Sequence, residues 1–449
     1  MHGVHGVGGS NPPVPTSILK IWIFMSITVK QVSLRAALMC VLAALFYCYE
    51  YYLRVAPAVM RPELMQSFNL SDAGLGALVA YYYHAYVPLQ LPVGIMMDKW
   101  GAKRVLVAAC FICALGTLVF AGTTELALAK FGRFLIGFGS AFAYVGVLKI
   151  ADSWLPNKYF AIVAGVATTL GMAGAMSGEI IMSKLVLVCG WRNTLYYASF
   201  GGLIFTLVLA IFLKNRPENE QPYKAPTVAK NDVGILEVLK KIILRKSVWV
   251  NGAIGCLAFL PLTIFAEMWA VTFLQESGMD RHSASIGSSI VFLGFGCGGP
   301  LWGTISDFLM RRRLPLFIGS LLSAFFTFWI VLFPSNNIAL MYCLLFLSGF
   351  FAGAQVIVFA VANDITEKEN LATTVAFTNM IIMLGGTFMQ PLVGVILDRL
   401  SDYTLIDNQI VHSFSDFKKA LIILPLGLVL SAVLSLVLKE SHKSRMQNN

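Results

Sequence analysis

Charged residues are scarce in this sequence. Asp, Glu, Lys and Arg together make up 12% of its 449 residues, whereas 57% of the residues are hydrophobic. Soluble domains usually carry about 25% charged residues, and the apolar segments here are too many and too long for a water-soluble core to bury. The shortage of charge therefore excludes an ordinary soluble protein and favours a chain that lies in a lipid bilayer.

Sequence signatures of enzymes are missing as well. The chain has no phosphate-binding loop, no nucleophile paired with a base, and no metal-ligand spacing among its six histidines. Cys110 and Cys113 form a CxxC pair, which in a soluble protein can indicate metal or redox chemistry. Both lie within an apolar segment, so we interpret them as packing residues. We predict no enzyme activity, no metal ion and no cofactor.

Runs of about 20 apolar residues recur along the chain, and each is long enough to cross a hydrocarbon core of about 30 Å as a helix. Helices are expected because lipid offers no partner for backbone N–H and C=O groups. The sequence therefore predicts an all-α membrane protein. Its twelve expected spans are 34–57, 73–97, 104–123, 131–154, 160–183, 194–213, 248–274, 284–305, 315–333, 338–363, 372–397 and 417–438.

Basic residues are unevenly distributed among the loops. The net charge of +10 could by itself indicate a nucleic-acid ligand. The basic residues concentrate, however, in alternate loops, with Lys103, Arg104 and residues 311–313 on the same side as the termini. This asymmetry follows the positive-inside rule. It predicts cytoplasmic termini in a multi-pass protein of the plasma membrane (the inner membrane of a bacterium), and it leaves no basic face for nucleic acid.

A polar linker divides the chain. This stretch is rich in Pro, Glu, Asn and Lys and cannot bury enough apolar surface to fold alone. The N-terminal stretch lacks the basic region and cleavage site of a signal peptide, so we expect a disordered tail, or a true start at Met25 that would exclude residues 1–24. The expected parts are an N-terminal tail 1–32, a first half 33–213, a cytoplasmic linker 214–247, a second half 248–438 and a cytoplasmic tail 439–449.

The two halves repeat one another. A Gly-x-x-x-Asp motif follows the second span at Gly94 and Asp98, and recurs after the eighth at Gly303 and Asp307. A third copy ends the eleventh span at residues 394–398. Many transporters are built from internal repeats, with the solute site at the interface between the repeats. The matching positions in the fourth and tenth spans are Gly137 and Asp152 with Gly349 and Asp364.

These motifs resemble those of a known family. Residues 94–104 (GIMMDKWGAKR) resemble the signature loop between helices two and three of the major facilitator superfamily, although Lys99 stands where the family usually has Arg. Residues 133–139 (RFLIGFG) are similar to the fourth-helix motif of that family, and residues 190–192 (GWR) precede the sixth helix as they often do there. The resemblance covers about 33–440. It implies a major facilitator fold with two pseudo-symmetric six-helix halves, acting as a monomer or weak dimer in secondary transport by alternating access.

The loop motif also has a direct physical interpretation. Glycine lets two helices approach closely, and an Asp at a helix end can pair with cations across the cytoplasmic seam between the halves. Such pairs would close one face and release it when the halves rock. The alternative is that the cations only anchor the topology. The gating role is predicted for Gly94, Asp98, Lys103, Arg104, Arg133, Gly303 and Asp307.

Ionisable residues within the spans are candidates for the solute site, because charge at bilayer depth is costly. Tyr47, Glu50, Tyr51 and Arg54 are spaced i, i+3, i+4 and i+7 in the first span, which places them on one helical face. We expect this polar face to line a central cavity, with Glu50 paired to Arg54. Alternatively, Arg54 extends to the outer headgroups and the two tyrosines only pack.

Further candidates lie in the second, fourth and seventh spans. Glu267 lies 213 positions after Arg54, close to the repeat offset, so the two should face each other. A carboxylate removed from water holds a proton more readily, which makes Glu267, together with Glu50, a candidate for proton coupling. The remaining candidates are Tyr83 and Gln90, and Lys149, which would either meet a substrate carboxylate or pair with Asp152.

The candidate residues indicate a charged solute. Arg54 resembles, by its position, the first-helix arginine of the organic-anion symporter branch, which implies an anionic substrate. Glu50 is not part of that pattern and suits a zwitterion such as an amino acid or a dipeptide. We predict proton-coupled secondary transport of a small charged or zwitterionic organic solute. The alternatives are a drug or metabolite efflux antiporter, whose usual Gly-Pro pair is missing from the fifth span, and a non-transporting sensor with a transporter fold.

Overall fold

The computed structural model describes residues 33–156, 159–216, 235–366, 370–400, 405–406, 409–410 and 413–438. The expected tails 1–32 and 439–449, and the linker from 217 to 234, lie outside the described residues. The regular secondary structure of the described residues is helical except for two antiparallel strands of two residues each, β1 (Leu405–Ile406) and β2 (Gln409–Ile410).

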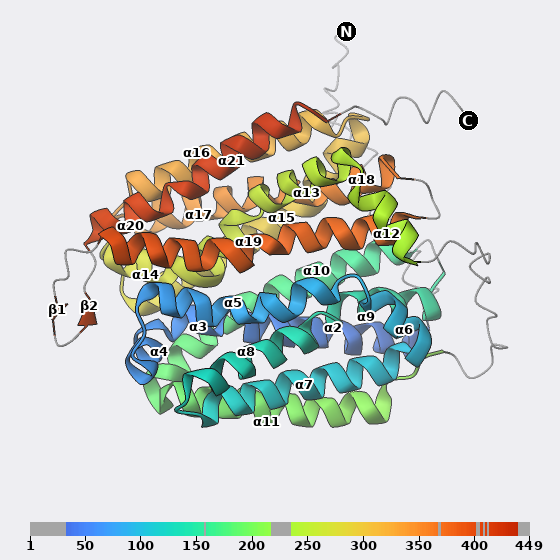
Figure 1. Ribbon diagram of the computed structural model, residues 1–449, viewed down its shortest axis with the longest axis horizontal. Coiled ribbons are helices and arrows are strands. Elements are labelled where there is room, and N and C mark those ends of the chain that lie inside the picture. The colour runs from blue at the N-terminus through green and yellow to red at the C-terminus, as the bar shows by residue number, and fades with distance from the viewer. Residues whose placement is uncertain are drawn as a thin grey trace, which may run out of the picture.

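The N-terminal half is a bundle of six spans (Figure 1). Several of its helices break into two pieces, and the short α4 lies between the first two spans. Its elements are α2 (Leu34–Arg54), α3 (Ala56–Val59), α4 (Arg61–Phe68), α5 (Asp72–Leu89), α6 (Val93–Trp100), α7 (Ala102–Gly122), α8 (Leu126–Ser140), α9 (Ala143–Trp154), α10 (Phe160–Ser177), the π-helical turn η2 (Gly178–Met182) and α11 (Ser183–Phe212).

The C-terminal half repeats this arrangement, and the short α12 precedes it. Its seventh span contains a second π-helical segment, η3. The elements are α12 (Ile235–Ile243), α13 (Lys246–Ala258), η3 (Pro261–Trp269), α14 (Ala270–Glu276), α15 (Arg281–Phe308), α16 (Arg313–Leu332), α17 (Ile338–Ala352), the 3₁₀ turn η4 (Gly353–Val356), α18 (Ile357–Asp364), α19 (Leu371–Leu400), α20 (Phe414–Leu421) and α21 (Ile423–Ser435).

Ten helical runs of the described chain are long and apolar enough to cross a membrane. One of them, Ile162–Phe212, has 51 residues, and at 1.5 Å per residue it would extend about 77 Å, far more than one crossing needs. It bends at Gly190, whose φ of 79° is not helical, and therefore makes two spans. The second expected span is split between α5 and α6 before Pro92, which accounts for the twelfth.

Glycines bring helices of each half into backbone contact. A side chain at Gly137 of α8 would overlap the carbonyl oxygen of Tyr82 on α5. In the other half, Gly349 of α17 meets the carbonyl oxygen of Val291 on α15 in the same way. Tyr82 and Val291 are related by the same offset of 209 as Gly94 and Gly303. The sequence repeat is therefore also a repeat in helix packing.

The expected close approach at the loop-motif glycines is wrong for this conformation. A Cβ atom at Gly94 or Gly303 would meet nothing within 4 Å. The third copy behaves differently, because a side chain at Gly394 would overlap the backbone of Asp72 at the start of α5. Of the three copies, it is the one in α19 that provides a close contact between the halves.

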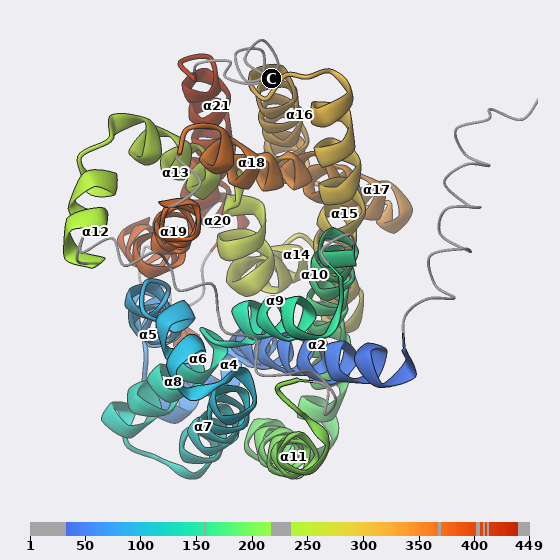
Figure 2. The same cartoon turned by 90° about the vertical axis from the view of Figure 1, so that its right-hand side faces the viewer.

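The halves meet along two helix pairs, α5 with α19 and α10 with α15 (Figure 2). We call the end of the molecule that carries β1 and β2 the hairpin end, and the opposite end, near α12, the linker end (Figure 1). At the hairpin end, both carboxylate oxygens of Asp398 accept backbone N–H groups, from Asp72 and Ala73, at 3.0 Å. This places a negative charge at the N-terminus of α5, where the helix dipole favours it.

A second contact closes the hairpin end. Arg281, the first residue of α15, binds both carboxylate oxygens of Glu63 on α4, at 2.8 and 3.1 Å. It also donates to the carbonyl oxygen of Val59. Two parallel N–H···O bonds make this pair directional as well as attractive, so the two halves are held together at this end.

The paired glycines yield a stability prediction. Gly137→Ala and Gly349→Ala should each destabilise the fold by about 1–3 kcal/mol, because the new methyl group must push two backbones apart. Thermal unfolding of the purified protein in detergent measures the effect. The matched control is Gly201→Ala in α11, where a Cβ atom meets nothing within 4 Å. Equal melting temperatures for all three variants would contradict the packing described here.

Candidate functional site

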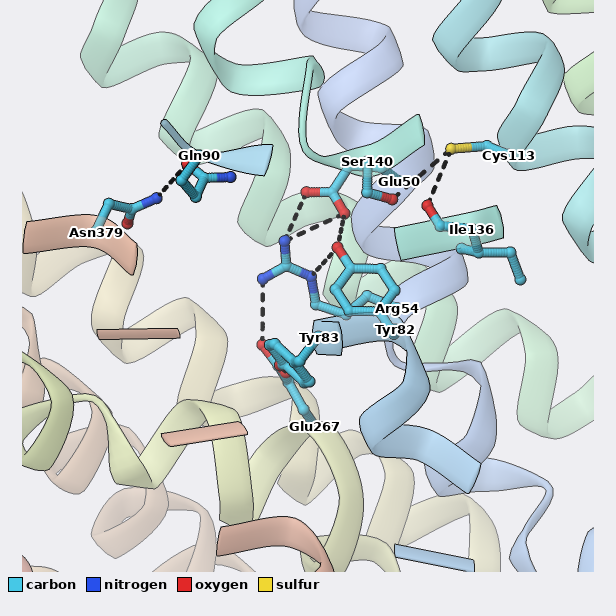
Figure 3. A network of polar contacts seen from close by, with 10 residues as sticks. All are labelled: Glu50, Arg54, Tyr82, Tyr83, Gln90, Cys113, Ile136, Ser140, Glu267 and Asn379. Carbon is cyan, nitrogen blue, oxygen red and sulfur yellow. Dashed lines mark hydrogen bonds and ion pairs between the residues drawn. The ribbon is translucent and has the colours of Figure 1, made fainter. Parts of the chain in front are cut away.

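A buried arginine lies at the centre of a network of polar contacts (Figure 3). Arg54, the last residue of α2, is 2% exposed. Its Nη2 donates to both oxygens of Glu50, at 3.0 and 3.3 Å, and its Nε donates to the Tyr82 hydroxyl at 3.0 Å. The same hydroxyl donates to Glu50 at 2.9 Å. The predicted Glu50–Arg54 pair is confirmed, and the burial of Arg54 excludes its extension to the headgroups.

Glu267 approaches this cluster from the other half. It lies in η3, and its Oε1 is 3.6 Å from Nη1 of Arg54. Its Oε2 accepts a hydrogen bond from the Tyr83 hydroxyl of α5. The prediction that Arg54 and Glu267 face each other is confirmed. One guanidinium therefore lies between a carboxylate of its own half and a carboxylate of the opposite half.

Part of this charge is not satisfied by hydrogen bonds. At 3.6 Å the Arg54–Glu267 contact is too long for a hydrogen bond. Among the described residues, Arg54 Nη1 finds no acceptor and Glu267 Oε1 finds no donor. Buried polar atoms of proteins nearly always have partners, so these two atoms are exceptions. They mark the place where a bound polar molecule would complete the network.

Arg133 lies beside this cluster rather than at the linker-end motif. It is 1% exposed, and its guanidinium lies over the ring of Tyr82, 5.3 Å from the centroid. Its Nη1 donates to the carbonyl oxygen of Leu53 at 3.3 Å, while Nε and Nη2 have no acceptor among the described residues. Arg133, for which a gating role was predicted, therefore lies at the central cluster and not among the residues of the loop motif.

The tyrosines of the first span support the arginine to different degrees. The ring of Tyr51 lies under the Arg54 guanidinium, 4.1 Å from ring centroid to Cζ. Such a contact stabilises a desolvated cation. Tyr47 instead packs edge-on against Tyr51 and against Tyr144. For Tyr47, the packing interpretation is therefore the better one.

Gln90 joins the halves nearer the linker end. Its side-chain oxygen accepts a hydrogen bond from Asn379 of α19 at 2.8 Å, and the two are visible at the edge of the cluster (Figure 3). Asn379 was not among the candidates predicted from the sequence, because those were selected mainly as ionisable residues and the amide of Asn379 carries no charge. The pair adds a polar contact to the α5–α19 interface.

The predicted pairing of Lys149 with Asp152 is wrong. Lys149 Nζ is 2.7 Å from Asp98 of the loop motif, and both side chains are solvent-accessible, at 38% and 65%. The ends of α6 and α9 approach each other, which brings Asp98 within reach of Lys149. Asp98 therefore has the cationic partner that was expected, but that partner belongs to its own half rather than to the opposite side of the seam.

The equivalent motif in the second half is also paired within its half. Arg312 binds Asp307 at 2.5 Å and Asp364 at 3.1 Å. Burial by itself would lower the pKa of Arg312, but the hydrogen bonds that Arg312 donates to these two carboxylates raise it above its ordinary value. Lys103, also of the loop motif, donates its backbone N–H to Asn215, and Arg104 is exposed.

Two buried residues escaped the sequence criteria. Tyr82 connects Arg54, Glu50 and Arg133, but of the three consecutive tyrosines only Tyr83 was predicted from the sequence as a candidate. Glu179 is a fully buried carboxylate in η2. Its signal was available, since any ionisable residue inside an apolar span is a functional candidate.

Comparison with known proteins supports a transport function for this chain. The chain is 23% identical over 353 residues to the probable galactarate/D-glucarate transporter GarP of Escherichia coli strain K12, with 71% of this chain and 79% of that protein covered. It is 24% identical over 373 residues to the hexuronate transporter of Bacillus subtilis strain 168, with 79% and 86% covered.

A solved structure has the same fold. A bacterial homologue of the human lysosomal transporter Spinster, in an inward-facing and unoccupied conformation, superposes with a TM-score of 0.68. It is 16% identical, and the match covers 90% of this chain and 95% of that one. The model of the protein family described as the Major Facilitator Superfamily matches residues 40–280 and 254–449. This chain therefore belongs to the Major Facilitator Superfamily and is a membrane transporter, not an enzyme.

Proposed function

We propose that this transporter is a proton-coupled symporter of a small organic acid anion, of the size and charge of a sugar acid. The observation that carries the proposal is the buried guanidinium of Arg54, whose Nη1 has no acceptor among the described residues. An arginine is always charged and has several N–H donors, so Nη1 can bind a carboxylate while Nη2 and Nε hold Glu50 and Tyr82. A substrate carboxylate would supply the missing acceptor.

The neighbouring charges favour an anion over a zwitterion. Arg133 adds two further nitrogens that lack acceptors within the described chain, whereas Glu50 already accepts three hydrogen bonds. The two named relatives are described as transporters of galactarate or D-glucarate and of hexuronate. A zwitterion remains the second candidate, because Oε1 of Glu267 lacks a donor and would suit an ammonium group.

Glu267 is the carboxylate that we assign to proton coupling. Arg54 is its cationic partner across the seam. When a substrate carboxylate takes over the guanidinium, Glu267 loses that partner in a buried site, and desolvation then favours the protonated form. Substrate and proton would therefore be bound together. Glu50 stays paired throughout, because Tyr82 and Nη2 of Arg54 still donate to it.

Alternating access requires the contacts between the halves to open at one end at a time. We assign the linker end to the cytoplasm, because the basic loops lie there. The hairpin end is then the outer side, closed by Arg281 with Glu63 and by Asp398 at the start of α5. The exposed motif residues Asp98 and Asp307 lie at the linker end, where they would re-pair as that face closes.

The first test concerns the anion site. Arg54→Lys should lower the affinity for D-glucarate or galacturonate by about 10-fold or more, because a single ammonium group cannot donate to Glu50, to Tyr82 and to a substrate carboxylate in the fixed planar arrangement of a guanidinium, and a charge-assisted hydrogen bond is lost. Ligand-induced thermal shift and uptake into proteoliposomes measure it. Arg35→Lys is the control, since Arg35 is exposed on the same helix. Normal binding by Arg54→Lys would contradict the site, and binding of only amino acids by the wild type would favour the zwitterion.

A second test concerns coupling. Glu267→Gln should abolish accumulation of substrate against its gradient under an imposed pH gradient, because glutamine cannot take up a proton. Counterflow with substrate on both sides should remain measurable. Glu125→Gln, at an exposed residue, is the control. Proton-driven accumulation by Glu267→Gln would move the coupling site to another carboxylate.

The third test concerns the closed hairpin end. Arg281→Gln should shift the population toward conformations open at that end, because the bidentate pair with Glu63 is lost. Spin labels on exposed Gln66 of α4 and exposed Asn336 before α17, in a background without native cysteines, report the separation of the halves. Lys130→Gln is the control, because Lys130 lies over Tyr81 of its own half. An unchanged distance distribution would rule out this contact as a closing element.

A further inference from the structure

The distance between Arg54 and Glu267 is unusually long for two opposite charges in a buried site. Nη1 of Arg54 lies 3.6 Å from Oε1 of Glu267, whereas charge-assisted N–H···O bonds are about 2.7–2.9 Å long. Both side chains are almost fully buried, and a buried charge without a partner is costly. A small movement would give each of the two atoms its partner, so another contact must hold them apart.

Contacts within the N-terminal half fix the arginine. Its Nη2 donates to Glu50, its Nε donates to the Tyr82 hydroxyl, and the guanidinium lies over the ring of Tyr51. Because these contacts define both the position and the plane of the guanidinium, Arg54 cannot move toward Glu267 without breaking them. The distance is therefore determined by the groups that hold Glu267.

Glu267 is held by a tyrosine of the opposite half (Figure 3). The Tyr83 hydroxyl of α5 donates to Oε2 of Glu267, which is the carboxylate oxygen that does not face Arg54. Tyr83 is fully buried. By fixing one carboxylate oxygen, this hydrogen bond limits how far the other oxygen can turn toward the guanidinium.

A glycine of α19 determines where the Tyr83 ring lies. A Cβ atom at Gly386 would be 2.5–2.7 Å from three atoms at the hydroxyl end of the Tyr83 ring, well inside the 3.4 Å at which ordinary contact begins. The ring of Tyr82 packs edge-on against the Tyr83 ring, with the centroids 5.1 Å apart. Tyr83 therefore packs directly on the backbone of α19, in a position that a side chain at residue 386 would prevent.

The glycine and the carboxylate are connected within the C-terminal half. Gln390, one turn beyond Gly386 in α19, donates its side-chain N–H to the carbonyl oxygen of Thr263 at 2.8 Å. Thr263 belongs to η3, the π-helical segment that also carries Glu267, and such segments occur frequently at functional sites. This bond ties η3 to α19, so Glu267 and Gly386 are held together while Tyr83 reaches both from the opposite half.

We propose that Tyr83 and Gly386 are positioning residues that hold Glu267 away from Arg54 and so keep Nη1 of the arginine available for the substrate. The inference rests on the proposed function, in which Arg54 binds a substrate carboxylate. Without the Tyr83 hydroxyl, Glu267 closes onto Arg54 and forms a direct charge-assisted hydrogen bond, which the substrate must then break. Both residues act through Glu267.

Substrate affinity tests the proposal. Tyr83→Phe should weaken the binding of D-glucarate or galacturonate by about 10-fold or more at neutral pH, because the substrate must displace a charge-assisted hydrogen bond. Gly386→Ala should also weaken it, because the new methyl group displaces the Tyr83 hydroxyl. Ligand-induced thermal shift measures the affinity. Uptake into proteoliposomes should show a raised KM with kcat changed by less than about twofold, because only binding is lost.

Tyr81→Phe and Gly385→Ala are the matched controls. Tyr81 lies on the same helix as Tyr83, with its ring beside Lys130. A Cβ atom at Gly385 would meet the side chain of Cys256, in its own half, at 3.0 Å. Both controls should bind substrate as the wild type does. Normal affinity in Tyr83→Phe would overturn the inference, and this variant, which removes only a hydroxyl, decides the question if Gly386→Ala does not fold.

A double-variant cycle separates positioning of Glu267 from a general effect on the fold. In a Glu267→Gln background, Tyr83→Phe should change the affinity by less than about twofold, because glutamine carries no charge that would draw it onto Arg54. An equal loss of affinity in both backgrounds would overturn the inference, since Tyr83 would then act independently of Glu267. A wild type that binds neither sugar acid would instead overturn the proposed function, and the inference with it.

Discussion

The guanidinium of Arg54 is the constraint on which the central part of the molecule depends. A permanent charge at 2% exposure must be compensated by neighbouring groups, and the compensation comes from Glu50, Tyr82 and Tyr51 on one side and Glu267 on the other. Because Glu267 belongs to the opposite half, the balance of charge changes whenever the halves move. A buried ion pair between the halves therefore depends on their relative position, and it lies where we propose that the substrate binds.

Three buried glutamates differ in how many of their carboxylate oxygens accept a hydrogen bond. Glu50 has donors for both oxygens, Glu267 for one, and Glu179 for neither among the described residues. The same chemical group is thus placed in three environments that favour ionisation to decreasing degrees. A graded set of carboxylates suits the proton coupling that we propose, because a carboxylate with fewer donors can take up a proton while Glu50 stays paired.

The contacts within each half are of a different chemical kind from several contacts between the halves. Inside each half, Gly137 and Gly349 bring backbones into contact and make those helix pairs rigid. Between the halves, ion pairs and hydrogen bonds such as Arg281–Glu63 and Gln90–Asn379 can be exchanged for water or for other partners. Rigid halves with exchangeable polar contacts between them allow rocking motion without unfolding.

Hydrophobic runs, positions of basic residues and spacing of motifs were enough to predict the twelve spans, the internal repeat and the Glu50–Arg54 pair, because these depend on local periodicity. The approach of Glu267 to Arg54 followed from the repeat offset alone. Other features depended on how neighbouring helices rotate and cross. These were the identity of the tyrosine that binds Arg54, the direction of the Arg133 side chain and the partner of Lys149. Glu179 shows the same limit: its carboxyl group is visible in the sequence, but only the tertiary structure shows that no group of the described residues donates a hydrogen bond to it.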